Sequence, residues 1–413
     1  MILRSGGAWR RPCTRRRALR HSICVAWLVP VAVALAVTGC GHRRKAARPH
    51  EVVFWHSLPP AVMQTLILRF EKDNPDVHVT AVEMPDSTSA DSAAAAVVAN
   101  APPDLCQLHG RDLPPFLAHN WLSDWSAGVA DLRPGLRGWE MCMLGDAIYG
   151  LPWVLSTEVL WFDRALFARA RLDTTRTPAT WNELRSAANR IERLHGGVHG
   201  YGLPVGREPR PLERFMPWAW SNGGDLLSAG LDSAQFDSPA NVRALEFLAS
   251  LRAASRLGSE DTLEHEFGAG HVGLLVADSR LRPRFAGTSI GSGAIPGPTA
   301  SGTTAATGEV LVSFTGSRHK EDALRLARFL VQPENARALA SAITGTLPSA
   351  RDSTLDERSD PLAHARFLPN VRNRTALEDT LQTLLDDAIL GRRNAADALA
   401  AADSFMTTHL GVK

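Results

Sequence analysis

From Glu51 onward, short strand-like runs alternate with helix-like segments along the chain. The strand-like runs cover 51–55, 77–82 and 104–108 and are rich in apolar residues that are β-branched or alternate with polar ones. Between them, residues 63–70 carry apolar side chains at helical spacing, and the small residues of 92–100 favour a second helix. Because such alternation lets helices cover the faces of a sheet, it predicts an α/β fold.

Helix-start signals continue this pattern through the rest of the chain. They are a capping box at 180–183, a Ser-Pro cap at 238–239, a Pro-Glu pair at 333–334 and a second capping box at 375–378. Gly391 stands where a helix would end in the left-handed conformation. The C-terminal part is therefore expected to be mostly helical. The stretch 287–308, rich in Gly, Pro, Ser and Thr, is expected to be a loop and crossing segment.

The N-terminus has the pattern of a bacterial lipoprotein signal. An arginine-rich start precedes an apolar stretch from Ile23 to Val37, and Thr38 and Gly39 lead directly to Cys40. An uncleaved anchor helix is disfavoured because this stretch is shorter than the roughly 20 residues that span a bilayer. We therefore expect residues 1–39 to be removed, Cys40 to carry a lipid and 40–50 to be a tether. The run 14–20 also resembles a twin-arginine export signal, so the export route stays open.

Size and charge narrow the class of protein. Removing 39 of the 413 residues leaves 374, which is more than one hydrophobic core usually supports and favours two lobes. The removed segment carries seven arginines, so the formal charge of +2 becomes about −5, and nothing in the charge pattern suggests nucleic acid. Cys106 and Cys142 lie among apolar residues and are expected to be two buried thiols, with one bridge as the alternative.

The order of local motifs along the mature chain resembles the extracellular solute-binding proteins of ABC importers that bind sugars and related polyols. The motifs are VVFWHS (52–57), FEKDNPDVHV (70–79), PPDLCQL (102–108), YGLPWVLSTEVLWFD (149–163), PATWNEL (178–184), WSNGGD (220–225), FGAGHVGLLVAD (267–278), TGEVLVSF (307–314) and GTLPSA (345–350). FWHS and PWVLSTEVLWFD look most like the branch that binds glycerol 3-phosphate and glycerophosphodiesters. Leu58-Pro59-Pro60 and Glu309 depart from that branch on loops that would face the ligand.

The resemblance implies a periplasmic-binding-protein type II fold, with two α/β lobes joined by crossing strands and a helical C-terminal part. It implies an N-terminal lobe of 51–159 plus 296–340 and a C-terminal lobe of 160–295 plus 341–413. The implied function is capture of a carbohydrate between the lobes and delivery to an ABC permease. Such a receptor is expected to be a non-enzymatic monomer without cofactor or metal, held outside the cytoplasm by its lipid. Glycerol 3-phosphate or a glycerophosphodiester is the alternative ligand.

The expectation that ligands bind beyond the carboxyl ends of strands selects Trp55, the imidazoles His56 and His109, and Ser279. The resemblance adds the indoles Trp153, Trp218 and Trp220 at cleft positions of the family, together with Ser156, Gly308 and Arg372. Indole rings suit the apolar faces of sugars, although each could equally be a core residue, and each polar group could be structural. By resemblance Arg372 would hold a phosphate, a role that Arg374 could also fill, and this distinguishes the two ligand classes.

Two enzyme motifs occur but lack the context they need. Gly287–Gly291 matches a nucleophile elbow around Ser289, yet no helix is expected to follow, so a lipoprotein-anchored serine hydrolase is a weak alternative. His265 and His271 are six residues apart and would not share a helix face, which argues against a zinc-protease site. No phosphate-binding glycine loop with Lys and Ser or Thr is present, so ATP would be handled by a partner. A scaffold that has lost ligand binding is the remaining alternative.

Overall fold

The structure is a computed structural model that describes residues 49–206, 210–228, 230, 233–285, 287–300, 302–351, 360, 362–371 and 374–409. These residues belong to one compact unit that spans 48–413. The expected signal, Cys40 and Arg372 lie outside the described residues. No helix in the described part of the chain has the length and apolar character needed to cross a membrane.

Strands from two halves of the chain form one continuous path of paired strands. Its order is β2-β1-β3-β11-β6-β9-β7-β8. The bounds are β1 (His50–His56), β2 (Val77–Glu83), β3 (Leu105–His109), β6 (Leu151–Asp163), β7 (Tyr201–Pro204), β8 (Ser255–Gly258), β9 (Leu274–Asp278) and β11 (Thr304–Val312). β1 pairs in parallel with β2 and β3, and β7 pairs in parallel with β8 and β9. Two parallel groups are thus joined through β11 and β6.

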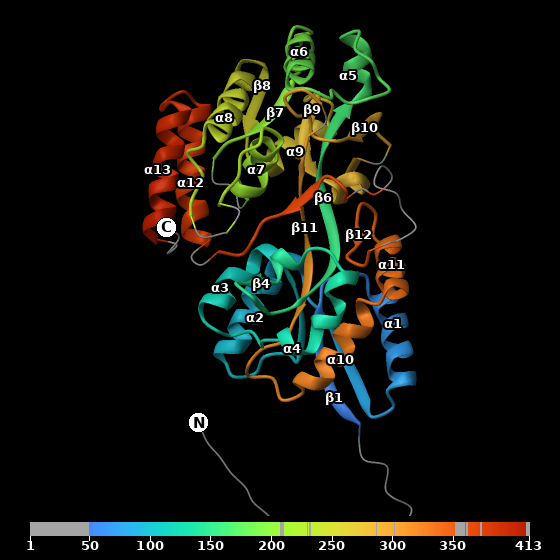
Figure 1. Cartoon of the computed structure of the whole chain (residues 1–413). Coiled ribbons are helices and arrows are strands. Elements are labelled where there is room, and N and C mark those ends of the chain that lie inside the picture. The colour runs from blue at the N-terminus through green and yellow to red at the C-terminus, as the bar shows by residue number, and fades with distance from the viewer. Residues whose placement is uncertain are drawn as a thin grey trace, which may run out of the picture. The chain divides into compact units, whose positions relative to one another are not determined.

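β6 is the strand that joins the two groups. Its first part pairs with β11, from Leu151 to Thr157, and its second part pairs with β9, from Glu158 to Phe162. β11 in turn pairs with β3, so β6 and β11 both run from one group of strands to the other (Figure 1). Short strands complete the sheet: β10 (Ile290–Gly293), β12 (Leu347–Pro348) and β13 (Ala365–Phe367), with a separate hairpin of β4 (Met143–Leu144) and β5 (Ala147–Ile148).

Helices cover each group of strands. With β1 to β3 lie α1 (Pro60–Asp73), α2 (Ser89–Val98), α3 (Leu113–Ala118), α4 (Ser126–Val129), α10 (Lys320–Leu330) and α11 (Pro333–Ala342). With β7 to β9 lie α5 (Arg164–Arg169), α6 (Trp181–Glu192), α7 (Pro211–Ser221), α8 (Pro239–Leu251), α9 (Glu260–Gly268), α12 (Arg374–Ile389) and α13 (Ala395–His409) (Figure 1). The molecule is therefore an α/β protein with two lobes.

Each lobe has its own hydrophobic core. Phe54, Phe70 and Trp153 are buried together in the N-terminal lobe, and the largest core of the C-terminal lobe unites α6, α7, α8, α12 and α13. The segment after α11 contributes to both lobes, since Ala350 and Leu362 pack in N-terminal cores whereas Leu368 and Val371 pack in the C-terminal one. The exact lobe boundaries remain a prediction.

Local signals placed most elements correctly, and two details differ. Thr180 accepts a hydrogen bond from the Glu183 amide (3.1 Å), as a capping box requires, but the Glu183 carboxylate accepts from the amide of Ala179 (3.0 Å). Within the stretch expected to be a loop, β10 pairs with β6. Gly391 has φ 74°, as expected. Cys106 and Cys142 are buried free thiols, which confirms the favoured expectation for them.

Candidate functional site

Strands from both lobes end at a common set of polar side chains. β1 and β3 of the N-terminal lobe end at His56 and His109, and β9 of the C-terminal lobe ends at Asp278. Desolvation lowers the pKa of His109 most, and the charges of Arg111 from the N-terminal lobe and of Arg280, Arg210 and Arg374 from the C-terminal lobe lower it further. We call this set the polar seam. It comprises Ser57, Gln107, His109, Arg111, Glu158, Arg210, Glu213, Glu260, Asp278, Arg280, Thr307, Glu309, Arg374 and Glu378.

On the C-terminal lobe, buried ion pairs hold the seam in place. Arg374 at the start of α12 donates to Glu213 (2.5 Å) and Glu378 (2.8 Å), and the Arg374 and Glu213 side chains are only 4 and 5% exposed. Arg210 pairs with Glu158 (3.0 Å) and also contacts Glu260. Each guanidinium is thus held between two carboxylates, which fixes its planar donors.

Burial sets the protonation of several of these carboxylates. Desolvation raises the pKa of Glu158 to about 7 and that of Glu378 to about 7, outweighing Arg210 and Arg374 respectively. Glu213 is different: burial opposes its charge, but Arg374 and Arg210 together hold its pKa below the usual value. The C-terminal face of the seam therefore combines an ionised glutamate with others that gain protons near neutral pH.

A second network connects β9 to the crossing strands. Asp278 accepts hydrogen bonds from Ser156 (3.0 Å) and from Arg280 (3.1 Å), and Arg280 also reaches Glu309 on β11 (3.2 Å). Glu309 pairs in register with His109 of β3, so Arg280 links the C-terminal lobe to the sheet of the N-terminal lobe. Burial raises the pKa of Glu309 to about 7, which outweighs the attraction of Arg280.

On the N-terminal lobe, neutral groups predominate. Gln107 accepts the Ser57 amide proton (3.0 Å) and donates its own amide to the Ser57 hydroxyl (2.9 Å). His109 is buried, and desolvation holds its pKa well below the ordinary value, so the ring is neutral. Its Nδ1 accepts from the Arg111 amide (3.3 Å), which leaves the proton on Nε2, 3.4 Å from Thr307 Oγ1.

Four of the other sequence-predicted residues have structural partners. His56 Nδ1 is hydrogen-bonded to the Leu58 carbonyl (3.1 Å) in a buried position where desolvation lowers its pKa. Ser279 donates to the Gly345 carbonyl (2.6 Å), which ties η6 (Ser279–Phe285) to the loop after α11. The Ser156 hydroxyl is held by Asp278, as above. Gly308 lets β11 approach β6, since a Cβ there would lie 2.1 Å from the Val154 carbonyl oxygen.

The structure distributes the four tryptophans among different surroundings. Trp153 is fully buried in the core of the N-terminal lobe, and Trp218 is buried in the core of the C-terminal lobe, where it borders a small cavity of about 40 Å³. Trp55 is half-buried and packs against a core cluster. Trp220 is nearly covered: its Nε1 donates to Asp225 (3.0 Å), and the Arg366 guanidinium lies over its ring at 4.7 Å. They do not come together as one aromatic surface.

Trp220 borders a pocket of about 670 Å³ that is separate from the seam residues. Residues of both lobes and of the segment 360–369 line this pocket, and Arg366 and Asp225 pair across part of it (2.7 Å). Its size suits a small molecule. However, none of the seam residues at the carboxyl ends of β1, β3 and β9 lines it, so the pocket does not fit the rule on which the site prediction rests.

The two motifs typical of enzymes have other roles. Ser289 directly precedes β10, and its carbonyl accepts from the Arg164 amide (2.8 Å), so it does not stand on a strand-to-helix turn. His265 lies in α9, whereas His271 follows the helix and pairs with Glu266 (2.9 Å). The motif contexts in the structure therefore agree with the sequence argument against a nucleophile elbow or a zinc-protease site.

Sequence reasoning missed most of the charged seam residues. It named Arg374 only as a substitute for Arg372, and it did not name Arg210, Glu213 or Arg280. The available signal was the group of charged residues within 207–214, together with the arginine that follows Ser279. Aromatic residues drew attention instead, because their affinity for sugars was the guiding expectation.

The chain is similar to known binding proteins over most of its length. The family of bacterial extracellular solute-binding proteins matches residues 65–365. An uncharacterised lipoprotein of Streptomyces antibioticus is 26% identical over 332 residues, which is 74% of this chain and 72% of the relative.

Solved structures agree on the fold. The cyclic α-maltosyl-1,6-maltose binding protein of Arthrobacter globiformis superposes with a TM-score of 0.76 at 22% identity, over 88% of this chain and 99% of that protein. UgpB of Mycobacterium tuberculosis, solved with glycerophosphocholine, gives 0.71 at 18% identity, over 88% of this chain and 98% of that protein. These likenesses confirm the two-lobed periplasmic-binding-protein fold. Because the family match covers more than half of the sequence, the chain belongs to the bacterial extracellular solute-binding proteins.

Proposed function

We propose that this protein is the substrate-binding component of an ABC importer and captures a carbohydrate at the polar seam. The observation that carries the proposal is that strands of both lobes end at one set of hydrogen-bonding groups, in which Arg280 contacts both Asp278 of β9 and Glu309 of β11. In open α/β sheets, ligands bind beyond the carboxyl ends of strands. A ligand held by groups of both lobes binds the closed form better than the open one, and this difference in affinity drives closure.

The pairing of the seam's arginines favours a neutral ligand over a phosphate. The seam defined above contains six carboxyl groups, those of Glu158, Glu213, Glu260, Asp278, Glu309 and Glu378, and four guanidiniums, while a fifth guanidinium, that of Arg214, also pairs with Glu260. Three of these arginines are each already held by two carboxylates. A phosphate needs unpaired guanidiniums, whereas sugar hydroxyls both donate to carboxylates and accept from neutral donors such as His109 Nε2. Glycerol 3-phosphate or a glycerophosphodiester is the second candidate, and its binding would depend on Arg372.

The test is a ligand panel with a thermal-shift readout. The full-length chain is expressed in an exporting bacterium, purified without a polyhistidine tag and mixed with mono- and oligosaccharides, sn-glycerol 3-phosphate and glycerophosphocholine. A bound ligand raises the melting temperature, because it binds only the folded state. We expect stabilisation by a carbohydrate that is lost in Arg280→Gln and kept in Arg392→Gln, whose guanidinium pairs on the exposed surface with Asp387.

Other outcomes separate the alternatives. Stabilisation by the phosphate compounds only, and its loss in Arg372→Gln, would move the assignment to the second candidate. No stabilisation by any compound would contradict both and favour a scaffold that has lost ligand binding.

The membrane attachment is a separate part of the proposal. A lipid on Cys40 would hold the receptor near its permease, and one relative is itself called a lipoprotein. Labelling of growing cells with a palmitate analogue should mark the wild type but not Cys40→Ser. The variant should also leave the membrane fraction. Equal labelling of both forms would contradict lipidation at Cys40.

A further inference from the structure

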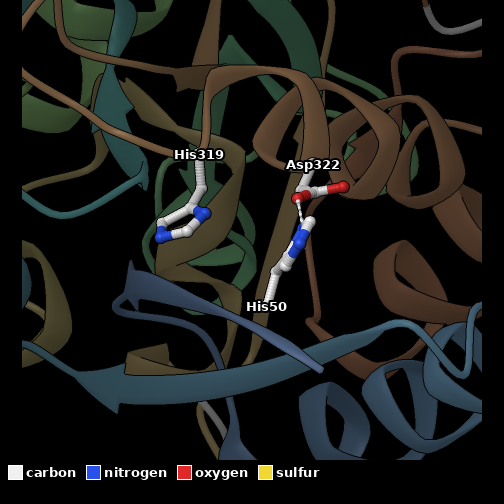
Figure 2. Close-up of side chains that lie close together, drawn as sticks. All are labelled: His50, His319 and Asp322. Carbon is white, nitrogen blue, oxygen red and sulfur yellow. Dashed lines mark hydrogen bonds and ion pairs between the residues drawn. The ribbon is translucent and has the colours of Figure 1, made fainter. Parts of the chain in front are cut away.

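Three metal-binding side chains converge at the end of the N-terminal lobe where β1 begins. His50 is the first residue of β1, and His319 and Asp322 come from the start of α10 (Figure 2). One donor atom from each residue lies within 4.8 Å of the other two. His50 Nδ1 is 2.9 Å from Asp322 Oδ2, and the two imidazole rings are 5.9 Å apart between centroids.

We propose that His50, His319 and Asp322 form a binding site for Zn²⁺. Two imidazoles and one carboxylate are borderline ligands that suit this ion, and three protein ligands leave a position for water. In a tetrahedral zinc site, bond lengths of 2.0–2.2 Å place ligand atoms about 3.3 Å apart. The His50 and Asp322 donors are already closer than this, and the His319 donor lies within 4.8 Å of both, so it has to move inward by at most about 1.5 Å.

The backbone that carries these side chains is fixed by hydrogen bonds. The His50 amide donates to the Asp76 carbonyl (2.8 Å), and the His319 amide donates to Ser317 (3.1 Å), which in turn donates to the buried Asp104 (2.7 Å). Arg325 holds the other carboxylate oxygen of Asp322, Oδ1 (2.9 Å), which leaves Oδ2 for the ion. Outer partners that orient a ligand in this way are typical of metal sites.

Charge and access also bear on the proposal. The His50 side chain is 62% exposed and that of Asp322 is 12% exposed, so an ion can enter from solvent. Asp76 adds a negative charge near His50, although it also forms an ion pair with Arg325. Arg318 and Lys320 are the sequence neighbours of His319, and their positive charges disfavour a bound cation. We therefore expect binding that is saturable but weaker than in a closed structural zinc site. The ion would connect the first strand, ten residues beyond Cys40, to α10.

The test measures Zn²⁺ binding by calorimetry at pH 7.5, on untagged protein freed of metal by a chelator. One ion should bind per chain, and His50→Gln and Asp322→Asn should each weaken binding about ten-fold or more. A matched control is His271→Gln, since His271 also pairs with a carboxylate at 2.9 Å but belongs to no three-donor group among the residues that the structure describes. Binding should fall at pH 5.5, because protons compete for the imidazoles.

A thermal scan shows whether a variant that loses Zn²⁺ binding is still folded. Without metal, wild type and His50→Gln should melt alike, and Zn²⁺ should raise the melting temperature of the wild type only. The proposal is overturned if no saturable binding occurs, or if the His50 and His271 variants lose Zn²⁺ equally.

Discussion

The two faces of the polar seam are held by different forces. The C-terminal lobe contributes buried ion pairs, in which Arg210 and Arg374 each contact two glutamates. The N-terminal lobe contributes mostly neutral hydrogen bonds. Gln107 both accepts a hydrogen bond from Ser57 and donates one to it, and His109 is uncharged. Most groups of both faces are buried and therefore need hydrogen-bond partners. On the C-terminal face, the desolvation of ions adds a further cost in free energy.

Because of this difference, we expect the two faces to contribute differently to a binding site. A buried ion pair adds little net stability over an apolar pair, yet breaking it is costly, so it fixes geometry strictly. Neutral hydrogen bonds are cheaper to exchange, and a ligand hydroxyl can take the place of one partner. We infer that the C-terminal face is the rigid wall of the site and that the N-terminal face is the one that adapts to the ligand.

The largest effect should come from breaking an ion pair on the rigid face. Arg374→Met leaves Glu213 and Glu378 without their shared cation, and we expect a loss of about 3–5 kcal/mol in the free energy of unfolding. Urea denaturation measures it. The matched control is Arg392→Met, whose exposed pair with Asp387 should be worth about 1 kcal/mol or less. Similar losses for the two variants would remove the distinction between a buried rigid face and the exposed surface.

A pH effect of intermediate size should come from Glu309, which stands between the faces. Its pKa in the folded state is about 7, above the ordinary 4.5, so the folded protein binds more protons than the unfolded chain between these values. Stability contributed by this group is therefore present below pH 4.5 and is lost as the pH rises to about 7. Glu309→Gln removes this loss.

Urea denaturation at pH 5 and pH 8 measures the change. Between these two values, Glu309→Gln should gain on the wild type by on the order of 2–3 kcal/mol. Glu334→Gln, which removes one charge from the exposed side of α11, serves as the control. Parallel pH profiles for wild type and Glu309→Gln would show that Arg280, not burial, governs the Glu309 carboxyl.

The smallest effect should come from the neutral face. Gln107→Ala leaves the Ser57 amide without its acceptor and should cost about 1–2 kcal/mol, less than the ion-pair variant. Gln64→Ala, on the exposed side of α1, should be near neutral. Denaturant midpoints of the two variants provide the measurement. A cost for Gln107→Ala equal to that of Arg374→Met would mean that the two faces are equally rigid.

Local sequence signals predicted much of the fold but only part of the site. The runs at 51–55, 77–82 and 104–108 became β1, β2 and β3, because strand periodicity is a local property. The Ser238 cap likewise starts α8, where its hydroxyl accepts from the Asn241 amide. β10 was missed because its four residues have no apolar alternation and take their partner from distant β6. Propensity carries no information about such a pairing.

The site is formed by residues that are distant in the sequence, so local patterns predict it less well than the fold. His109 was predicted because it follows a strand, and it lies at the seam. Trp153 and Trp218 were chosen for their chemistry, but core packing outweighs loop position for large apolar rings, and both are buried. The proposed zinc site could not be found by a motif search, because His50 and Asp322 are separated by 272 positions and share no spacing pattern.

By itself, the sequence determined the α/β class, the helix starts and the family, because alternation, capping and motif order are written within short windows. Only the tertiary structure decided which charges meet. Arg374 and Glu213 are 161 positions apart, and Ser156 and Asp278 are 122 apart. The physical reason is that burial and pairing depend on how the lobes pack around the crossing strands, and these two quantities shift the pKa values of the seam glutamates, such as Glu213 and Glu309.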